Sequence, residues 1–363
     1  MSSGRIGRGE SREARGAEIL TSRENRWLKE FRVALRGGVA TATGAVGVEG
    51  LRLVEEALSS GCRVEAVLFS ESGERWRERL APLVGRAEMG FPALRTTDRL
   101  FEGIADTEHP QGVAALVVPR MVTLEELVGG EKFSVPEKGG TSRLRTSANT
   151  EATKIGIQGA QSQERRRQRR DAENAEDLEK TTEEPLTNDE GGARKENSPC
   201  AALIVVLAGV QDPGNVGTIV RTAAAFGATG VVTAATGQSG TASPFAPKAL
   251  RASAGAALHL PVLTGMAMGV LLTQLKVMGI QTVASCVHEE GADALAPWEV
   301  KWCEPVALLV GNEGAGLPAD VVHAADGRIH IPMATQVESL NAGAAAAVVL
   351  YEAYRQRRRR EDQ

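Results

Sequence analysis

Three loops in the C-terminal half of the chain combine small residues with single polar ones, a composition that could hold a nucleotide and act on it. They are "GVQDPGNVGTIVR" (209–221), "GNEGAGLP" (311–318) and "IPMATQVESLN" (331–341). Glycines in such loops let the backbone approach a ligand closely. Two uses are open at this point: a cradle for phosphates, or a pocket for a flat heterocycle with an uncharged body.

The sequence patterns of phosphate cradles are absent from the first two loops. Neither has the G-x-G-x-x-G order of a dinucleotide site, and neither contains the lysine of a P-loop. We therefore favour the heterocycle pocket. In this interpretation Gly311 and Gly316 make room for backbone contacts, and Ile331, Met333 and Leu340 supply apolar walls.

Arg221 stands out because it is the charged residue of an otherwise apolar helical segment, "VGTIVRTAAAFGA". If it is buried it needs a partner, which could be a phosphate, a carboxylate such as Glu313, or a subunit interface. The alternative is an ordinary surface arginine. Asn215, six residues earlier, could be a site residue or the N-cap of the helix.

The elements that would position these loops form a regular series after Cys200. Strands that are apolar throughout and separated by helices predict a parallel sheet covered on both faces, with ligands bound at the carboxyl ends of the strands. The last helix is expected to begin at Ser339, a suitable N-cap. The expected strands are 201–210, 230–235, 280–287, 305–311 and 328–333, and the other expected helices are 215–228, 247–258, 265–278 and 317–325.

The rest of the chain divides by composition. Residues 1–18 lack an apolar period and are expected to be a disordered leader. Residues 19–130 alternate short β-like runs with helices and predict a small α/β domain. Residues 131–198, which include "RRRQRR" followed by an acidic stretch, are expected to be a disordered linker, either a solvated spacer or an RNA-attracting tether.

Length and charge set further limits. A chain of 363 residues can form two domains, and a formal net charge of −4 gives no global argument for nucleic acid, so any such role must rest on local charge. The four scattered cysteines form no zinc pattern and are interpreted as free thiols in a reducing compartment. Without a spanning apolar stretch or a secretory signal, we expect a cytoplasmic protein.

Taken together, three motifs resemble the SPOUT superfamily of S-adenosylmethionine-dependent RNA methyltransferases, in the SpoU (TrmH) branch that methylates ribose 2′-hydroxyls. The motifs are "DPGNVGTIVRTAAAFG" (212–227), "LLVGNEGAGLP" (308–318) and "IHIPMATQVESLNAGAAAAVVLYE" (329–352). Further upstream, "TSRENRWLKEFRVAL", "VEGLRLVEEAL" and "HPQGVAALV" look like the substrate-binding domain often fused ahead of this catalytic domain. The resemblance covers about 19–130 and 199–356.

The resemblance implies a fold and a cofactor. The C-terminal domain, 199–356, would carry a deep trefoil knot, and the protein would work as a homodimer with its active site near the subunit interface. S-adenosylmethionine would lie bent in the knot. The residues implied in holding it are Gly311, Gly316, Ile331, Met333 and Leu340.

The same resemblance implies roles for the polar residues, without a metal. Arg221 would grip the phosphate beside the target ribose or stabilise a developing alkoxide, because a guanidinium stays protonated and is a poor base. Asn215, Glu313, Ser339 and Asn341 would orient Arg221, the ribose and the charged ends of the cofactor. In the N-terminal domain, Asn25 and Lys29 are candidates for RNA contact.

Large-subunit ribosomal RNA is the first expectation for the substrate, because the fused N-terminal domain is common among such enzymes. Transfer RNA, a non-enzymatic RNA-binding protein that retains the knotted fold, and a nucleotide-dependent enzyme are the alternatives. The presence of Arg221, Glu313 and Asn341 speaks against the second, and the missing lysine against the third. The linker and the basic tail at 357–363 could add RNA affinity through counterion release.

Overall fold

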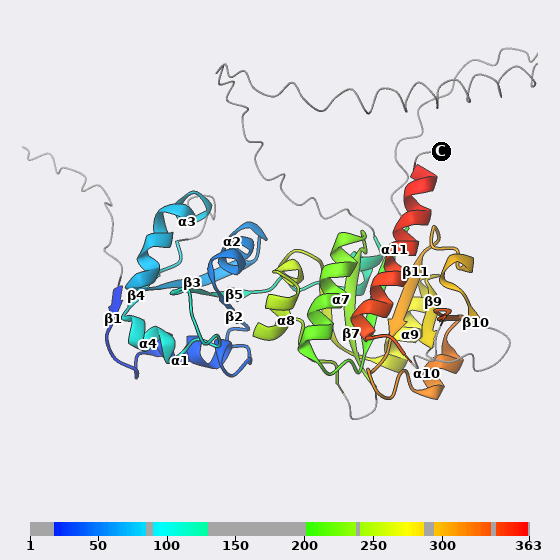
Figure 1. Cartoon of the computed structure of the whole chain (residues 1–363), viewed down its shortest axis with the longest axis horizontal. Helices are drawn as coiled ribbons and strands as arrows, with labels where there is room; N and C mark the ends of the chain where they lie inside the picture. Colours follow the sequence, from blue (N-terminus) through cyan, green and yellow to red (C-terminus); the bar gives the residue numbers. More distant parts are fainter. Residues whose placement is uncertain are drawn as a thin grey trace, which may run out of the picture. The chain divides into compact units, whose positions relative to one another are not determined.

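The structure is a computed structural model that describes residues 18–84, 90–129, 201–236, 240–286, 294–334 and 339–361. Almost all of the expected leader, and the whole of the expected linker, lie outside the described residues. The described chain forms two β-sheets, one from residues before the expected linker and one from residues after it (Figure 1).

The first sheet has five strands in the order β1-β4-β3-β5-β2 and is mixed, because β5 pairs antiparallel with both β2 and β3. The expected first helix begins after Asn25, whose side chain accepts a hydrogen bond from the Trp27 N–H at 2.9 Å. Its buried face contains Leu28, Phe31 and Leu35, as the helical spacing predicts. The elements are β1 Glu18–Leu20, α1 Arg26–Leu35, β2 Val46–Glu49, α2 Leu51–Ser59, β3 Arg63–Ser70, η1 Ser72–Trp76, α3 Arg77–Val84, β4 Ala93–Thr96, α4 Asp98–Glu102, β5 Val113–Val118 and α5 Leu124–Val128.

The second sheet has seven strands in the order β10-β12-β9-β11-β6-β7-β8, and every pairing within it is parallel. This confirms the parallel sheet predicted from the apolar runs. Its strands are β6 Leu203–Ala208, β7 Gly230–Ala235, β8 Val262–Ala267, β9 Gln281–Cys286, β10 Ala294–Leu295, β11 Val306–Val310 and β12 Gly327–His330. Its helices are α7 Pro213–Ala225, α8 Pro247–Ala252, η2 Ala256–Leu258, α9 Met268–Val277, η3 Pro297–Glu299, α10 Ala319–Ala324 and α11 Ala342–Glu361.

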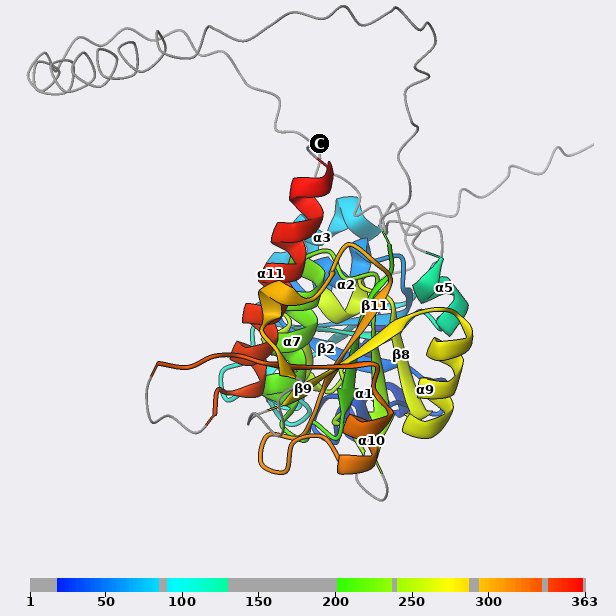
Figure 2. The same cartoon turned by 90° about the vertical axis from the view of Figure 1, so that its right-hand side faces the viewer.

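Helices cover both faces of the parallel sheet. On the central strand β11, Leu308 packs in the core that contains residues of α7 and α11, whereas the next residue, Leu309, packs in the core that contains residues of α9 and α10. Figure 2 shows the two pairs of helices on opposite sides of the strands. Because successive strand residues point to opposite faces, a strand buried on both sides must be apolar throughout.

Several boundaries differ from the expectation. The helix predicted over 247–258 ends at Ala252, and a separate short helix follows at Ala256–Leu258. The helix predicted over 265–278 begins only at Met268, because Val262–Ala267 pairs with β7 as an edge strand. The last helix begins at Ala342 rather than at Ser339, and it continues to Glu361, through most of the expected basic tail. Arg357 fixes this end of α11 through hydrogen bonds to several backbone carbonyls, including that of Trp302 at 2.7 Å.

Candidate active site

The three loops singled out in the sequence all leave the carboxyl ends of strands in the parallel sheet. Residues 209–212 follow β6, residues 311–318 follow β11, and residues from 331 onward follow β12. Since β6 and β11 are neighbours in the centre of the sheet, the first two loops lie side by side. The fold therefore brings them to the edge at which open parallel sheets bind ligands.

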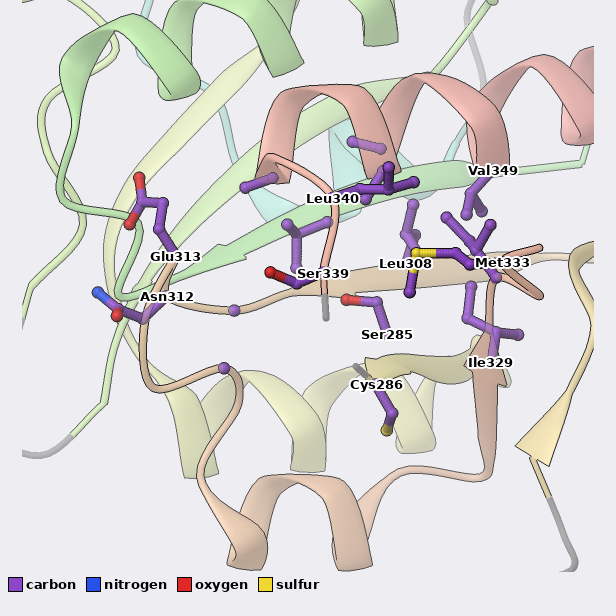
Figure 3. Close-up of a pocket in the computed structure, with 17 residues that line it drawn as sticks. Ser285, Cys286, Leu308, Asn312, Glu313, Ile329, Met333, Ser339, Leu340 and Val349 are labelled. Atoms are coloured by element: carbon purple, nitrogen blue, oxygen red, sulfur yellow. The ribbon is translucent and has the colours of Figure 1, made fainter. Parts of the chain in front are cut away.

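A pocket opens at this edge, and every residue predicted to hold the cofactor lines it: Gly311, Gly316, Ile331, Met333 and Leu340. Two of the predicted catalytic residues, Glu313 and Ser339, line it as well. Figure 3 shows apolar side chains gathered toward one end of the pocket and the polar Asn312 and Glu313 at the other. The apolar side chains at that end are Leu308, Ile329, Met333 and Val349.

The glycine loop after β11 folds back on itself. Asn312 and Gly316 exchange two backbone hydrogen bonds of 3.0 Å, and a Cβ on Gly311 would lie 2.4 Å from the carbonyl carbon of Gly316. Gly316 has φ +69°, which glycine adopts without strain. The Asn312 side chain closes the turn by accepting the N–H groups of Gly314 and Ala315, both at 2.9 Å. The loop is thus a compact turn whose backbone faces the pocket.

Glu313 is the centre of a hydrogen-bond network that joins the three loops. Its carboxylate accepts the Asn215 Nδ2–H at 2.9 Å and the backbone N–H groups of Gln211 and Asp212, each at 3.2 Å. The Asn215 side-chain oxygen accepts in turn from Nδ2 of Asn341 at 3.0 Å. Asn215 therefore directly contacts both Glu313 and Asn341, which are also predicted to orient the reactants.

The charge of Glu313 follows from this environment. Partial burial of the carboxylate raises its pKa, but the hydrogen bonds from Asn215 and from the backbone outweigh burial and leave the pKa below its usual value. Glu313 is therefore ionised at neutral pH. A carboxylate with a lowered pKa is a poor proton acceptor, so the geometry favours an orienting role for this residue.

The helix caps near the site exclude the cap alternative for Asn215 and correct the expected cap at Ser339. Asp212, and not Asn215, is the N-cap of α7, because its Oδ2 accepts the Asn215 backbone N–H at 3.2 Å. Likewise Asn341, and not Ser339, caps α11: its Oδ1 accepts the N–H of Gly343 at 2.9 Å and that of Ala344 at 3.3 Å. The side chains of Asn215 and Ser339 therefore do not cap these helices.

Arg221 is exposed on α7 and does not line the pocket. Within the described residues it makes no hydrogen bond or ion pair, so the suggested partner Glu313 is instead held by Asn215 and the backbone. The exposure of Arg221 agrees with the alternative of an ordinary surface arginine, and its contact with a phosphate or a second subunit stays a prediction.

The two N-terminal candidates have local partners. Asn25 caps α1, and Lys29 forms an ion pair with Glu24 at 2.6 Å while about half of its side chain is exposed. Neither observation bears on RNA, and their proposed contact with RNA stays a prediction.

Several pocket residues were missed in the sequence. Ser285 and Cys286 enter from the end of β9, which is the neighbour of β11, and Ala345 and Ala346 enter from α11. The position of Ser285 and Cys286 at a strand end was the available signal. Asn312 could have been found as the polar residue that follows the first glycine of the loop.

Membrane-spanning helices and metal sites are both absent from the described ranges. No helix within them is long and apolar enough to cross a membrane. No group of three or more His, Cys, Asp or Glu side chains within them is arranged to hold a metal ion.

Comparison with known proteins matches both parts of the described chain to families. The SpoU rRNA Methylase family matches residues 202–351, and the MRM3-like substrate binding domain matches residues 41–115. The chain is 35% identical over 158 residues to the 23S rRNA (guanosine(2553)-2'-O)-methyltransferase RlmP of Bacillus subtilis, covering 43% of this chain and 60% of the relative. It is 41% identical over 158 residues to an uncharacterized tRNA/rRNA methyltransferase of Synechocystis, covering 44% of this chain and 55% of the relative. The chain thus spans about half the length of the curated relatives that it matches.

Solved structures share the fold over nearly the whole chain. An rRNA methyltransferase from Sinorhizobium meliloti with bound AdoMet superposes with a TM-score of 0.62 at 23% identity, covering 93% of this chain and 98% of that one. An RNA 2'-O ribose methyltransferase superposes with a TM-score of 0.55 at 26% identity, covering 93% and 99%. These matches confirm the resemblance seen in the three motifs. By these family matches, residues 202–351 form a SpoU rRNA methylase domain and residues 41–115 form an MRM3-like substrate-binding domain.

Proposed function

We propose that this protein transfers a methyl group from S-adenosylmethionine to a ribose 2′-hydroxyl of RNA. The observation that carries the proposal is the pocket at the carboxyl edge of the sheet, with the Glu313, Asn215 and Asn341 network at its polar end. The relative named as a ribosomal RNA 2'-O-methyltransferase aligns with 43% of this chain at 35% identity, and this supports the assignment.

The residues of the pocket fit such a cofactor. Its apolar side chains, among them Leu308, Ile329 and Met333, match the apolar carbon atoms of such a cofactor, and the closed turn at 311–316 offers backbone groups to its flat heterocycle. When bound, the cofactor supplies an electrophilic methyl group. We assign Gly311, Gly316, Ile331, Met333 and Leu340 to its binding.

The polar residues would place the ribose against that methyl group. Glu313 is held ionised by its donors, and we assign it, with Asn215 and Asn341, to orienting the reacting groups, since correct placement alone can supply much of the rate. Ser339, exposed at the pocket, is assigned to the same task. Arg221 would bind the phosphate beside the ribose or stabilise the developing alkoxide.

Completion of the site would require a second subunit. α11, which packs on α7, presents Val348 and Tyr351, which are 45% and 55% exposed, and the centroid of the Tyr351 ring lies 5.6 Å from that of Phe226 at the end of α7. An apolar face of this kind supports a homodimer that places Arg221 near the reactants. The proposal includes the deep trefoil knot that the resemblance implies.

Large-subunit ribosomal RNA is the proposed substrate, on the strength of the MRM3-like domain and of the relative named for that RNA. Such a substrate would place the enzyme in the cytoplasm, where bacterial ribosomes are made. Transfer RNA is the alternative substrate, and a binding protein without catalysis is the alternative function.

Two experiments test the proposal. Calorimetry with S-adenosylhomocysteine should show binding to the full chain, and an absence of heat at high protein concentration would contradict it. Transfer of a labelled methyl group to ribosomal RNA should be lost in Arg221→Ala while S-adenosylhomocysteine affinity is retained. Methylation by this variant at a near wild-type rate would show that Arg221 is misassigned, and mapping of 2′-O-methyl positions would separate the two RNA classes.

A further inference from the structure

Lys248, which played no part in the motifs, contacts the edge of the candidate site. Its Nζ lies 2.5 Å from Oδ1 of Asp212, and Asp212 donates its own backbone N–H to Glu313 at 3.2 Å. One residue thus separates the lysine ammonium from the carboxylate at the centre of the network.

Two glycines of α7 fix the lysine in this place. A Cβ on Gly217 would lie 2.3 Å from the carbonyl oxygen of Ala249, so α7 and α8 are in backbone contact there (Figure 1). A Cβ on Gly214 would lie 3.4 Å from Cε of Lys248, so the lysine stem passes over the first turn of α7. The position of the ammonium is therefore built into the packing of two helices.

The charge at this edge of the site calls for a cation. Glu313 and Asp212 are both carboxylates, and the pKa of Asp212 is lowered, chiefly by its hydrogen bond from Lys248. An RNA ribose arrives with a negatively charged phosphate on each side, which two unpaired carboxylates would repel. Lys248 pairs with Asp212 and thereby reduces this repulsion.

Lys248 also keeps donors for a ligand. An ammonium has three N–H groups, of which Asp212 takes one, and 61% of the lysine side chain is exposed. Asp212 is itself held in place, because its other oxygen caps α7 through the Asn215 N–H. The ammonium is thus oriented by a fixed carboxylate while its remaining donors are accessible.

We propose that Lys248 binds an RNA phosphate next to the target ribose, with Asp212 as the residue that positions its ammonium. This inference rests on the proposed function and adds to it a substrate contact outside the three motifs. It assigns α8, and not only α7, to the recognition of the RNA backbone.

The test compares three full-length variants by equilibrium binding to a transcript of large-subunit ribosomal RNA over a range of salt concentrations. Lys248→Gln should weaken binding about tenfold and lower the slope of log affinity against log salt by about 0.7 to 0.9, as expected for one lost phosphate contact. Lys248→Arg keeps the charge and should restore most of the slope. Lys276→Gln removes an exposed lysine of α9, on the other face of the sheet, and should match wild type.

Three outcomes are informative. Equal slopes for Lys248→Gln, Lys276→Gln and wild type would overturn the proposal. A tenfold loss of S-adenosylhomocysteine affinity in Lys248→Gln would also overturn it, because the lysine would then hold the cofactor. Wild-type protein serves as the separate test of the proposed function: if it binds S-adenosylhomocysteine and methylates RNA while Lys248→Gln behaves like wild type, only the inference about Lys248 fails.

Discussion

Replacing Asn215 with alanine tests whether the network around Glu313 sets the catalytic geometry. The substitution removes the side-chain donor to Glu313 at 2.9 Å and the side-chain acceptor for Asn341 at 3.0 Å. The backbone N–H of residue 215 can still donate to the carboxylate of Asp212, which caps the helix. The fold should therefore persist, and the orientation of Glu313 and Asn341 should not.

The expected magnitudes separate stability from activity. All three side chains are partly or largely exposed, so water can replace the lost partners, and the free energy of unfolding should fall by only about 1 kcal/mol. The rate constant kcat should fall about 100-fold, equivalent to about 2.7 kcal/mol, because small misplacements of reacting groups have effects of this size. The assays are urea denaturation and methyl transfer to ribosomal RNA at saturating cofactor.

The pH profile gives an independent measurement. Among the hydrogen bonds that lower the pKa of Glu313, that from Asn215 is the largest, so its loss should move the pKa up toward the usual value. A carboxylate whose pKa is lower in the folded state stabilises the protein at pH values above its unfolded-state pKa of about 4.3. This stabilisation is lost as the pH falls through the folded-state pKa. In Asn215→Ala the acid loss of activity should therefore begin at a higher pH than in wild type, because Glu313 is protonated at a higher pH, whereas the contribution of Glu313 to the acid loss of stability should become smaller.

A matched control is available on the same helix. Thr222 donates to the Thr218 carbonyl at 2.8 Å and touches no part of the network, so Thr222→Ala should behave like wild type in all three assays. If Asn215→Ala retains kcat within about twofold and an unchanged acid limb, the network does not set the geometry and the reasoning is refuted.

Three further predictions concern the loop, the surface and the C-terminal helix. Gly311→Ala should weaken S-adenosylhomocysteine binding at least about tenfold in calorimetry, because the new Cβ would lie 2.4 Å from the backbone of Gly316. Gly314→Ala should bind normally, because the nearest atom to its new Cβ would be 3.6 Å away. Val348→Asp should shift sedimentation from dimer to monomer, and an unchanged dimer would place the subunit interface elsewhere. Arg357→Ala should lower the free energy of unfolding in urea by about 2 kcal/mol, because several backbone carbonyls lose their hydrogen-bond donor. Arg357→Lys should recover little of this stability, because an ammonium lacks the planar arrangement of donors that a guanidinium has. Full stability of the alanine variant would contradict this prediction.

Much of the C-terminal fold could be predicted because its strands are apolar throughout, a pattern that a parallel sheet buried on both faces requires. The meeting of the three loops followed from the rule that such sheets bind ligands at their carboxyl edge. That rule predicts that Gly311, Ile331 and Leu340 share one pocket, and all three residues line it.

Other features could not be predicted, because the local sequence does not determine them. Ser339 and Asn341 are both good N-caps, as are Asp212 and Asn215, and only the three-dimensional path of the chain decides between the members of each pair. The exposure of Arg221 depends on which face of α7 packs against the sheet. Lys248 comes within reach of Asp212 only through the packing of α8 on α7, 36 residues along the chain.

In the proposed function, the two ends of the Asn341 amide would serve different ligands. Its oxygen holds the first turn of α11, whose Ala342 and Ala345 line the pocket, and its nitrogen holds Asn215 in the network that would face the RNA. A cofactor that orders the start of α11 also reduces the freedom of Asn215, so RNA then has less ordering entropy to lose on binding. Thermodynamic linkage makes this coupling reciprocal: each ligand must raise the affinity for the other by the same factor, and one amide group would carry it.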